Sequence, residues 1–216
     1  MPRRGVRRSP RSATFRHVSE DESAIEDAKR VLRRELRTRR AERGAAWSAA
    51  DGPAIAARLQ ELVIAHGART ISAYLSTPDE PDTRAFLAWA GEQGIRVLLP
   101  VIREDGLLDW AEHDGTETIE ATLGMPEPTA DALPPTALDD VDLMLIPATA
   151  VGRDGSRLGG GRGFFDKTIA AMADCPPVYA VVHDEELFDS VPHAGYDQPV
   201  DGVVTPSGIT RLTTRS

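Results

Sequence analysis

The 216-residue chain has one cysteine, few aromatic side chains and no apolar run near the roughly 18 residues that a membrane-spanning helix needs. A single cysteine excludes an internal disulfide and a metal site built from several cysteines. The five histidines show no ligand spacing such as His-x-x-x-His, which argues against a zinc site. We therefore expect a cytoplasmic protein with no membrane partner.

Several common catalytic and nucleotide-binding fingerprints are also missing. The sequence has no Gly-x-Ser-x-Gly, so a serine hydrolase is not supported. It has neither the Gly-x-x-x-x-Gly-Lys-Ser/Thr pattern of P-loop proteins nor the Gly-x-Gly-x-x-Gly pattern of dinucleotide-binding folds. Any phosphate site must therefore be built in another way.

Charge is distributed unevenly along the chain, whose formal net charge is −9. Residues 1–16 hold six arginines and no acid, so the other 200 residues carry a net charge of −15. An acidic body argues against nonspecific nucleic-acid binding by the fold itself. We expect residues 1–22 to form a disordered basic leader, 23–210 one domain and 211–216 a tail. A mis-assigned start and a nucleic-acid arm are alternative interpretations of the leader.

Helical and strand-like patterns alternate along the chain. We expect helices at 23–43, 46–65, 82–93 and 163–173, strands at 69–76, 95–102, 141–146, 178–182 and finally 200–204, and an edge strand at 107–111. Residues 113–140 are expected to form a long surface connection. The alternation predicts an α/β fold: a single three-layer domain with a mainly parallel sheet and helices on both faces.

The first expected helix is strongly basic. Its apolar stripe consists of Ile25, Ala28, Val31, Leu32 and Leu36. Its basic residues are Lys29, Arg30, Arg33, Arg34, Arg37, Arg39 and Arg40. We expect most of these charges to form a solvated face paired with Glu26 and Glu35.

The most informative segment is residues 157–166, Arg-Leu-Gly-Gly-Gly-Arg-Gly-Phe-Phe-Asp. Four glycines within five residues disfavour a helix interior or a strand, because each costs roughly 0.5–1 kcal/mol there relative to alanine. A glycine-rich turn that opens a helix binds anions well, since the first-turn N–H groups lack partners. Arg157, Arg162 and Lys167 add positive charge, and Asp166 adds a carboxylate. The segment predicts a site for phosphate and a divalent cation, with a flexible linker as the alternative.

Further polar side chains follow the expected strands, where ligands of parallel sheets bind. Asp82 or Thr83 is expected to cap the helix that follows, whereas Glu80 is not needed as a cap and is a candidate ligand-binding residue. Asp184 is expected to cap a short helix at 185–188. Asp197 has no evident structural role.

Five ordered segments carry a family resemblance. They are 28–33, with Lys-x-x-Leu-Arg; 75–83, with Glu-x-Asp-Thr; 125–128, Met-Pro-Glu-Pro; 142–147 leading into 157–166; and 197–205, with Asp-x-x-x-Asp-x-x-Val. Together, over about residues 27–205, they resemble the 5-formyltetrahydrofolate cyclo-ligases, also called methenyltetrahydrofolate synthetases. The family signature at 157–166 is Arg-Leu-Gly-x-Gly-x-Gly-Tyr-Tyr-Asp.

The resemblance implies a single three-layer α/β domain and an ATP- and Mg²⁺-dependent reaction. In that reaction 5-formyltetrahydrofolate becomes 5,10-methenyltetrahydrofolate: the formyl oxygen is phosphorylated, N10 closes the ring, and ADP and phosphate are released. The implied partner is a small molecule, a reduced folate with or without a polyglutamate tail, and the implied state is a monomer.

The resemblance also assigns site residues. The implied catalytic residues are Arg157, Arg162 and Asp166. ATP is assigned to Lys29, Arg30, Arg33, Gly159, Gly160, Gly161, Arg162, Gly163, Phe164 and Phe165. The folate is assigned to Leu75, Glu80, Gly160, Gly161, Arg162, Gly163 and Phe164, and Mg²⁺ to Asp166 and Asp197.

The chain departs from the family pattern at several positions. Phe164 and Phe165 replace two tyrosines and so lack two hydroxyl groups, and Gly152 replaces an aspartate before the signature. Ala148 stands where a glycine is common, and Ala194 and Tyr196 stand where relatives often have a glutamate and a polar residue. A non-catalytic or retargeted paralogue that binds nucleotide or folate is therefore the alternative hypothesis.

Overall fold

The computed structural model describes residues 20–118 and 125–212. Its helices are α1 (Glu20–Arg43), α2 (Ala45–His66), α3 (Arg84–Glu92) and α4 (Phe164–Ala171), with 3-10 turns η2 (Pro135–Asp140) and η3 (Asp184–Glu186). Its strands are β1 (Thr70–Ser72), β2 (Arg96–Ile102), β3 (Leu108–Glu112), β4 (Glu117–Thr118), β5 (Glu127–Pro128), β6 (Leu143–Pro147), β7 (Ala150–Gly152), β8 (Arg157–Leu158), β9 (Val178–Val181), β10 (Leu187–Phe188), β11 (Gly202–Thr205) and β12 (Gly208–Arg211).

Seven strands form the central sheet, in the order β12-β11-β9-β6-β1-β2-β3. The five inner strands are parallel, and β3 and β12 pair antiparallel at the two edges. The prediction of a mainly parallel sheet is confirmed, as is the edge strand near 107–111. The prediction that residues 200–204 form the last strand is wrong, because β12 returns along β11 after a tight turn.

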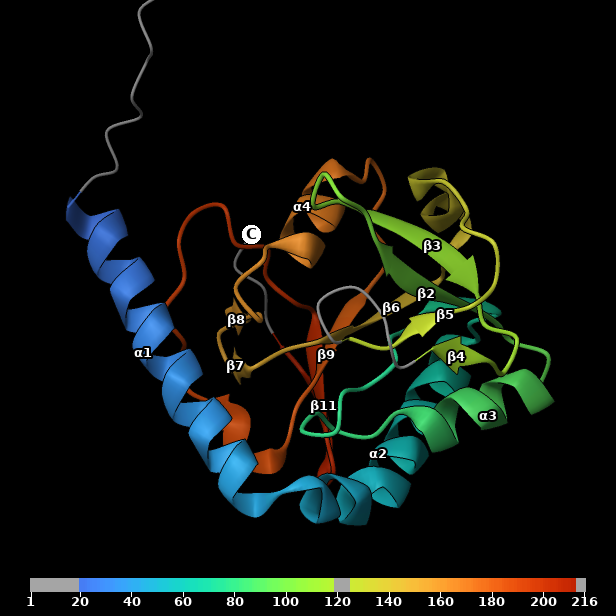
Figure 1. Ribbon diagram of the computed structural model, residues 1–216, viewed down its shortest axis with the longest axis horizontal. Coiled ribbons are helices and arrows are strands. Elements are labelled where there is room, and N and C mark those ends of the chain that lie inside the picture. The colour runs from blue at the N-terminus through green and yellow to red at the C-terminus, as the bar shows by residue number, and fades with distance from the viewer. Residues whose placement is uncertain (1–19, 119–124, 213–216) are drawn as a thin grey trace, which may run out of the picture.

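Both faces of the sheet are covered, which gives the expected three layers (Figure 1). Alternate residues of β6 point to opposite sides: Leu143 and Leu145 join the core under α2 and α3, whereas Met144 and Ile146 join the core under α4 and η2. Apolar residues on both faces explain why this strand has a continuous hydrophobic run instead of an alternating one.

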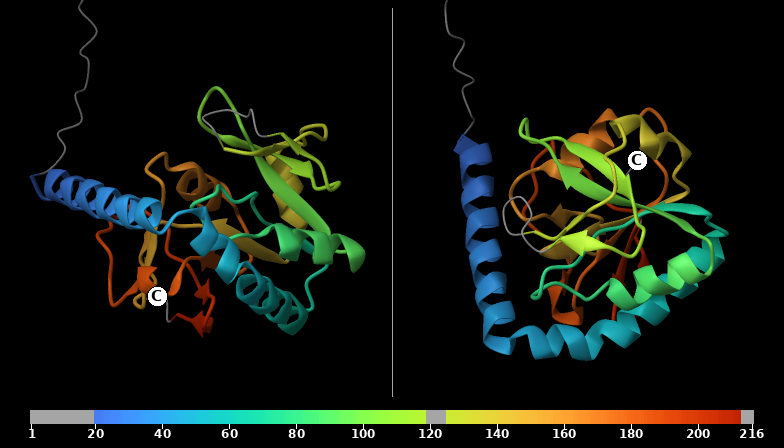
Figure 2. Two further views of the ribbon diagram at one scale, coloured as in Figure 1. Left: turned by 60° about the horizontal axis from the view of Figure 1, so that its bottom comes forward. Right: turned by 45° about the vertical axis from the view of Figure 1, so that its right-hand side comes forward.

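Helix α1 stands outside these layers, along one side of the molecule, and forms an L with α2 (Figure 2). The two helices meet at Gly44, whose φ of 71° suits glycine. Leu32 and Leu36 of α1 pack against the small sheet β10-β7-β8, where Ala150 and Leu158 are buried. The predicted helix end at Gly67 is confirmed: its φ is 62°, and its N–H bonds to the carbonyl of Ile64.

The expected surface connection at 113–140 contains regular structure. Strands β4 and β5 pair antiparallel, and η2 packs Leu138 into the core. Short paired strands of two residues carry too little periodicity to be seen in a sequence. Residues 1–19 of the predicted leader and 213–216 of the predicted tail lie outside the described residues. The predicted boundaries are displaced, because α1 begins at Glu20 and β12 ends at Arg211. Among the residues described, no helix has the length and apolarity to span a membrane.

Candidate active site

The site lies where the chain order of the sheet reverses. From β1 the chain runs to β2 and β3 on one side, and it then returns to β6, β9 and β11 on the other. Diverging connections leave a crevice at the carboxyl ends of the two strands at such a switch point, here β1 and β6. Glu80 follows β1, Ala148 and Thr149 follow β6, and all three line one cavity there.

The glycine loop, residues 159–163, crosses this crevice and opens α4, as the sequence predicts. Gly161 and Gly163 have φ values of 102° and 68°, in the left-handed region that other residues rarely adopt. Gly163 occupies the N-cap position of α4, and no side chain caps that helix end. The loop borders a cavity on each of its two sides.

The switch-point cavity, on one side of the loop, has a volume of about 240 Å³. Glu80, Arg40, Phe164 and Phe165 line it, together with the loop glycines Gly159, Gly160 and Gly163. Burial raises the pKa of the Glu80 carboxyl, although the N–H of Thr77 donates a hydrogen bond of 2.9 Å to it. The two phenylalanines offer apolar surface facing a carboxyl group.

The α1 cavity, on the other side of the loop, has a volume of about 450 Å³. Lys29 is only 1% exposed, and its Nζ lies 2.5 Å from Asp197 Oδ2 and 2.8 Å from Glu26 Oε1. Burial alone would lower the pKa of Lys29, but hydrogen bonds to Asp197 and Glu26 outweigh it and raise the pKa. Lys29 is therefore a fixed positive charge beside the loop.

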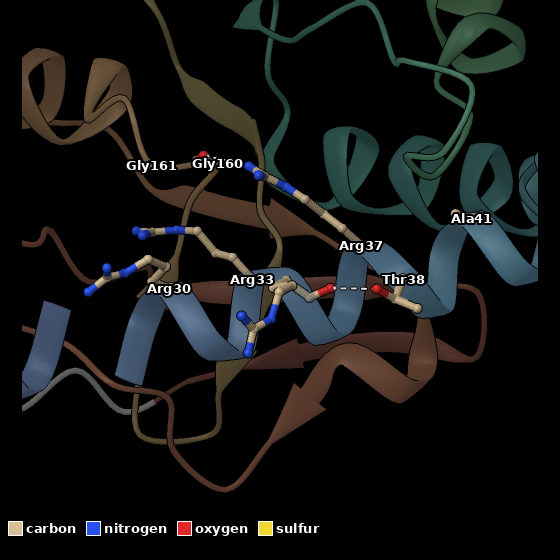
Figure 3. Close-up of a pocket in the computed structure, with 8 residues that line it drawn as sticks. Arg30, Arg33, Arg37, Thr38, Ala41, Gly160 and Gly161 are labelled. Atoms are coloured by element: carbon tan, nitrogen blue, oxygen red, sulfur yellow. Dashed lines mark hydrogen bonds between the residues drawn. The ribbon is translucent and has the colours of Figure 1, made fainter. Parts of the chain in front are cut away.

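Two loop-facing arginines of α1 hold the glycine loop in place. Arg33 Nε donates to the carbonyl of Gly159 at 2.9 Å, and Arg37 donates to the carbonyl of Gly160 at 2.8 Å. With Arg30 and Arg34 they line an arginine groove of about 520 Å³ along the outer side of the loop (Figure 3). The groove shares Arg37 and Gly160 with the switch-point cavity, and Arg33 and Gly161 with the α1 cavity.

The carboxylates predicted to bind metal, Asp166 and Asp197, both line the α1 cavity. Asp166 Oδ1 pairs with Arg157 and accepts from the N–H of Gln198 at 3.0 Å. Asp197 pairs with Lys29 and accepts from the N–H of Ala194 at 2.6 Å. In the described ranges no group of three or more His, Cys, Asp or Glu side chains is arranged to hold a metal. Two carboxylates still suit Mg²⁺, which keeps several waters and shares the oxygens of a bound phosphate.

The predicted site residues gather around the loop, with two exceptions. Arg157 and Arg162 line both cavities. The side chain of Arg30 is largely exposed, pairs with Asp27 and reaches only the arginine groove. Leu75 is buried in the core under α2 and α3 and lines none of the three spaces.

Three side chains were expected to cap helices. Asp184 does not cap the turn after it, because its carboxylate accepts from Ser207 and His183 occupies the cap position. Thr83 stands at the N-cap of α3, but its hydroxyl donates to the carbonyl of Tyr74. Asp82 Oδ1 accepts the N–H of Arg84 at 3.0 Å.

Sequence reasoning missed Arg37, Arg40 and Tyr196. The inward face of α1 consists of residues at helical spacing, Lys29, Arg33, Leu36 and Arg40. Val31, which was predicted to belong to the apolar stripe, is instead 52% exposed. Tyr196 donates to Glu26 at 2.6 Å, and its ring centroid lies 4.9 Å from Lys29 Nζ. The helical spacing of Arg37 and Arg40 from Lys29 and Arg33 is a signal that could have found them.

Comparison with known proteins adds a family. The model of the 5-formyltetrahydrofolate cyclo-ligase family matches residues 25–206. The 5-formyltetrahydrofolate cyclo-ligase of Mycolicibacterium smegmatis is 39% identical over 150 residues, which cover 67% of this chain and 77% of that protein. The Escherichia coli K12 protein of the same name is 32% identical over 154 residues, 68% of this chain and 82% of that protein.

A solved structure supports the fold. The NMR structure of the 5,10-methenyltetrahydrofolate synthetase of Aquifex aeolicus superposes with a TM-score of 0.71 at 22% identity, covering 87% of this chain and 95% of that chain.

Proposed function

Because the chain belongs to the 5-formyltetrahydrofolate cyclo-ligase family, we propose that it converts 5-formyltetrahydrofolate to 5,10-methenyltetrahydrofolate with consumption of ATP. The observation that carries the proposal is the glycine loop, which lines a basic cavity on one side and a cavity with Glu80 and two phenylalanines on the other. Two reactants bound on the two sides would approach each other at the loop, where the glycines have no side chains to keep them apart.

The α1 cavity is the proposed ATP side. Lys29, Arg33 and Arg162 would neutralise the phosphate oxygens, and the bare N–H groups of the loop would donate to them. The fixed charge of Lys29 suits this role, since its buried position leaves little reorganisation for the reaction. Asp166 and Asp197 would hold Mg²⁺, which supplies charge neutralisation of the phosphates when bound.

The switch-point cavity is the proposed folate side. Phe164 and Phe165 offer apolar surface for a flat heterocycle, and Glu80 offers a carboxylate to its N–H groups. Leu75 is buried in the core, so it would support the wall of the cavity from behind and would not contact the folate directly. The two phenylalanines keep the stacking surface of the family's tyrosines and lack only their hydroxyl groups.

The chemistry needs positioning more than covalent help from the protein. A bond forms between the formyl oxygen and the γ-phosphorus while the bond to ADP breaks. N10 then bonds to the formyl carbon and loses its proton, and the C–O bond breaks to release phosphate. Arg157 and Arg162 line both cavities, so their charges lie beside the point where the transferred phosphoryl group would pass.

The test is direct conversion by the purified full chain. With 5-formyltetrahydrofolate, ATP and Mg²⁺ we expect formation of the methenyl product, followed by its absorbance, with one phosphate released per product. Omission of ATP or Mg²⁺ is the matched control. No product together with unhydrolysed ATP would refute the proposal.

We further propose that the arginine groove receives the negatively charged glutamate tail of the folate. The groove (Figure 3) shares Arg37 and Gly160 with the switch-point cavity, and its arginines are the right partners for carboxylates. Arg34→Gln should raise KM for a pentaglutamate more than for a monoglutamate. Arg39→Gln is the matched control, because Arg39 lies on the same helix and pairs with Glu35 outside the groove.

A further inference from the structure

Arg40 is the most deeply buried arginine of α1, at 6% exposure. Its Nε lies 2.6 Å from Glu186 Oε1, its Nη2 lies 2.8 Å from Glu186 Oε2, and Nη2 also donates to the carbonyl of Ala148 at 3.0 Å. Glu186 belongs to η3 after β9, and Ala148 follows β6. The guanidinium therefore joins α1 to the carboxyl ends of two neighbouring strands.

Glu186 is itself held in place. Its Oε2 accepts the N–H of His183 at 2.9 Å, and its side chain is 4% exposed. A bidentate pair with this geometry fixes the plane of the guanidinium. Arg40 thus has one orientation, set by the strand ends and not by solvent.

Arg40 also lines the switch-point cavity, together with Glu80. Burial raises the pKa of the Glu80 carboxyl, and the N–H of Thr77 and the positive charge of Arg40 oppose this rise without cancelling it. The other charged groups of this cavity are Asp79, which raises the pKa of Glu80, and Arg37, Arg157, Arg162 and Asp166. The hydroxyl of Tyr74 is buried and has no hydrogen-bond partner in the described part of the chain.

We propose that Arg40 is a positioning residue: held by Glu186 and by the carbonyl of Ala148, it places a fixed positive charge in the same cavity wall as Glu80, on the folate side of the site. The inference rests on the proposed function. A bound heterocycle would remove water from Glu80 and disfavour its charged form, so a fixed cation beside it has its greatest effect in the complex. Glu186 offsets part of the charge of Arg40. The positive potential at Glu80 is therefore weaker than Arg40 alone would produce, but stronger than it would be without Arg40.

Removing Arg40 and removing the charge of Glu186 should shift the pH profile in opposite directions. If Glu80 must be ionised, activity is lost as pH falls through its pKa, and Glu80→Gln should remove this acid limb. Arg40→Gln takes away the cation, so the acid limb of kcat/KM for the folate should move up by about 0.5–1 pH unit. Glu186→Gln leaves the charge of Arg40 without its counterion, so the limb should move down. Arg40→Lys keeps the charge but loses the bidentate pair with Glu186, so its acid limb should lie between those of the wild type and Arg40→Gln.

The experiment measures kcat/KM for the folate from pH 5 to 9 in the full chain, with thermal unfolding of each variant beside it. A purely structural role would lower activity by the same factor at every pH and leave the limb where it is. That outcome, or shifts of the same sign in Arg40→Gln and Glu186→Gln, overturns the inference. If Arg40→Gln does not fold, an unmoved limb in Glu186→Gln overturns it alone. A wild type without turnover overturns the proposed function as well, so the two failures are distinguishable.

Discussion

Gly152 is a position where a small change should have a large effect on stability. It ends β7, where the family pattern has an aspartate, and it precedes the turn that leads to Arg157. A Cβ atom on Gly152 would lie 2.8 Å from the Cα of Ser190 and closer still to Ser156 Oγ and Asp154 Oδ1. Real Cβ atoms essentially never come under 3.0 Å, so Gly152→Ala must displace the surrounding backbone.

The expected cost follows from what would have to move. Ser156 Oγ donates to Asp154 Oδ1 at 2.5 Å and accepts the N–H of Val191 at 3.0 Å, so these side chains cannot swing away freely. Overpacking typically costs about 1–3 kcal/mol, and each hydrogen bond lost costs about 1 kcal/mol more. We expect Gly152→Ala to lower the free energy of unfolding by about 2–4 kcal/mol, or Tm by about 5–15 °C for a chain of this length.

Urea denaturation followed by circular dichroism measures the effect. Gly91→Ala is the matched control: Gly91 lies in α3, its added Cβ would meet nothing within 4 Å, and alanine favours helices by about 1 kcal/mol. The control should therefore be unchanged or slightly more stable than wild type. A loss below about 0.5 kcal/mol for Gly152→Ala would refute the reasoning from close contacts.

Three further changes test the site and the turn. Phe164→Tyr with Phe165→Tyr should change kcat by less than about fivefold, the worth of one hydrogen bond, and a gain above about a hundredfold would instead indicate a decayed site. Lys29→Met should lower kcat/KM for ATP by at least about a hundredfold, measured at saturating folate, and an unchanged value would remove Lys29 from the phosphate site. Burial would raise the pKa of Asp154, but hydrogen bonds from Ser156 and Ser190 outweigh it and lower the pKa to about 2. The ionised carboxylate of Asp154 therefore stabilises the fold above pH 3.8 by about 1–2 kcal/mol after solvent screening, and this contribution is lost as pH falls toward 2. In an acid titration, Asp154→Asn should lose correspondingly less free energy of unfolding than the wild type. An equal loss in both proteins would contradict this prediction.

The layers of the fold were predictable because they depend on local pattern. The runs of β2 and β6 are apolar on both faces, and a glycine ends α2. The hydrophobic pattern and the helix-terminating residue therefore predict the same elements that the structure has. Residues 113–140 were not predictable, because β4 and β5 each contribute only two residues and owe their pairing to the tertiary structure. The strand β12 was missed because its four residues, Gly-Ile-Thr-Arg, have a weak apolar signal.

The position of the glycine loop at the start of α4 was predictable, whereas the partners of the loop were not. Its four glycines and two arginines are close in sequence, but Arg33 and Arg37 lie more than a hundred residues away from the carbonyls they bind. A basic helix is normally a solvated one, and most of α1 fits that expectation. The inward face differs because one residue in every three or four points to the same side, namely Lys29, Arg33, Leu36 and Arg40, and three of these four are cations. An apolar stripe interrupted by regularly spaced cations is therefore better interpreted as a ligand-facing surface.

The departures from the family pattern are accompanied by local compensation, which argues for an active site and against a decayed one. Tyr196 stands where relatives often have a polar residue, and its hydroxyl donates to Glu26, which in turn pairs with Lys29. Gly152 lacks the carboxylate of the family, and Asp154 places one in the space where a side chain at 152 would lie. A decayed site would accumulate unpaired buried charges, because no selection would maintain partners for them. Lys29 and Arg40 instead retain carboxylate partners at 2.5 and 2.6 Å. The charged residues around the two phenylalanines therefore keep their partners. The loss of two hydroxyl groups should affect the rate and not the identity of the reaction.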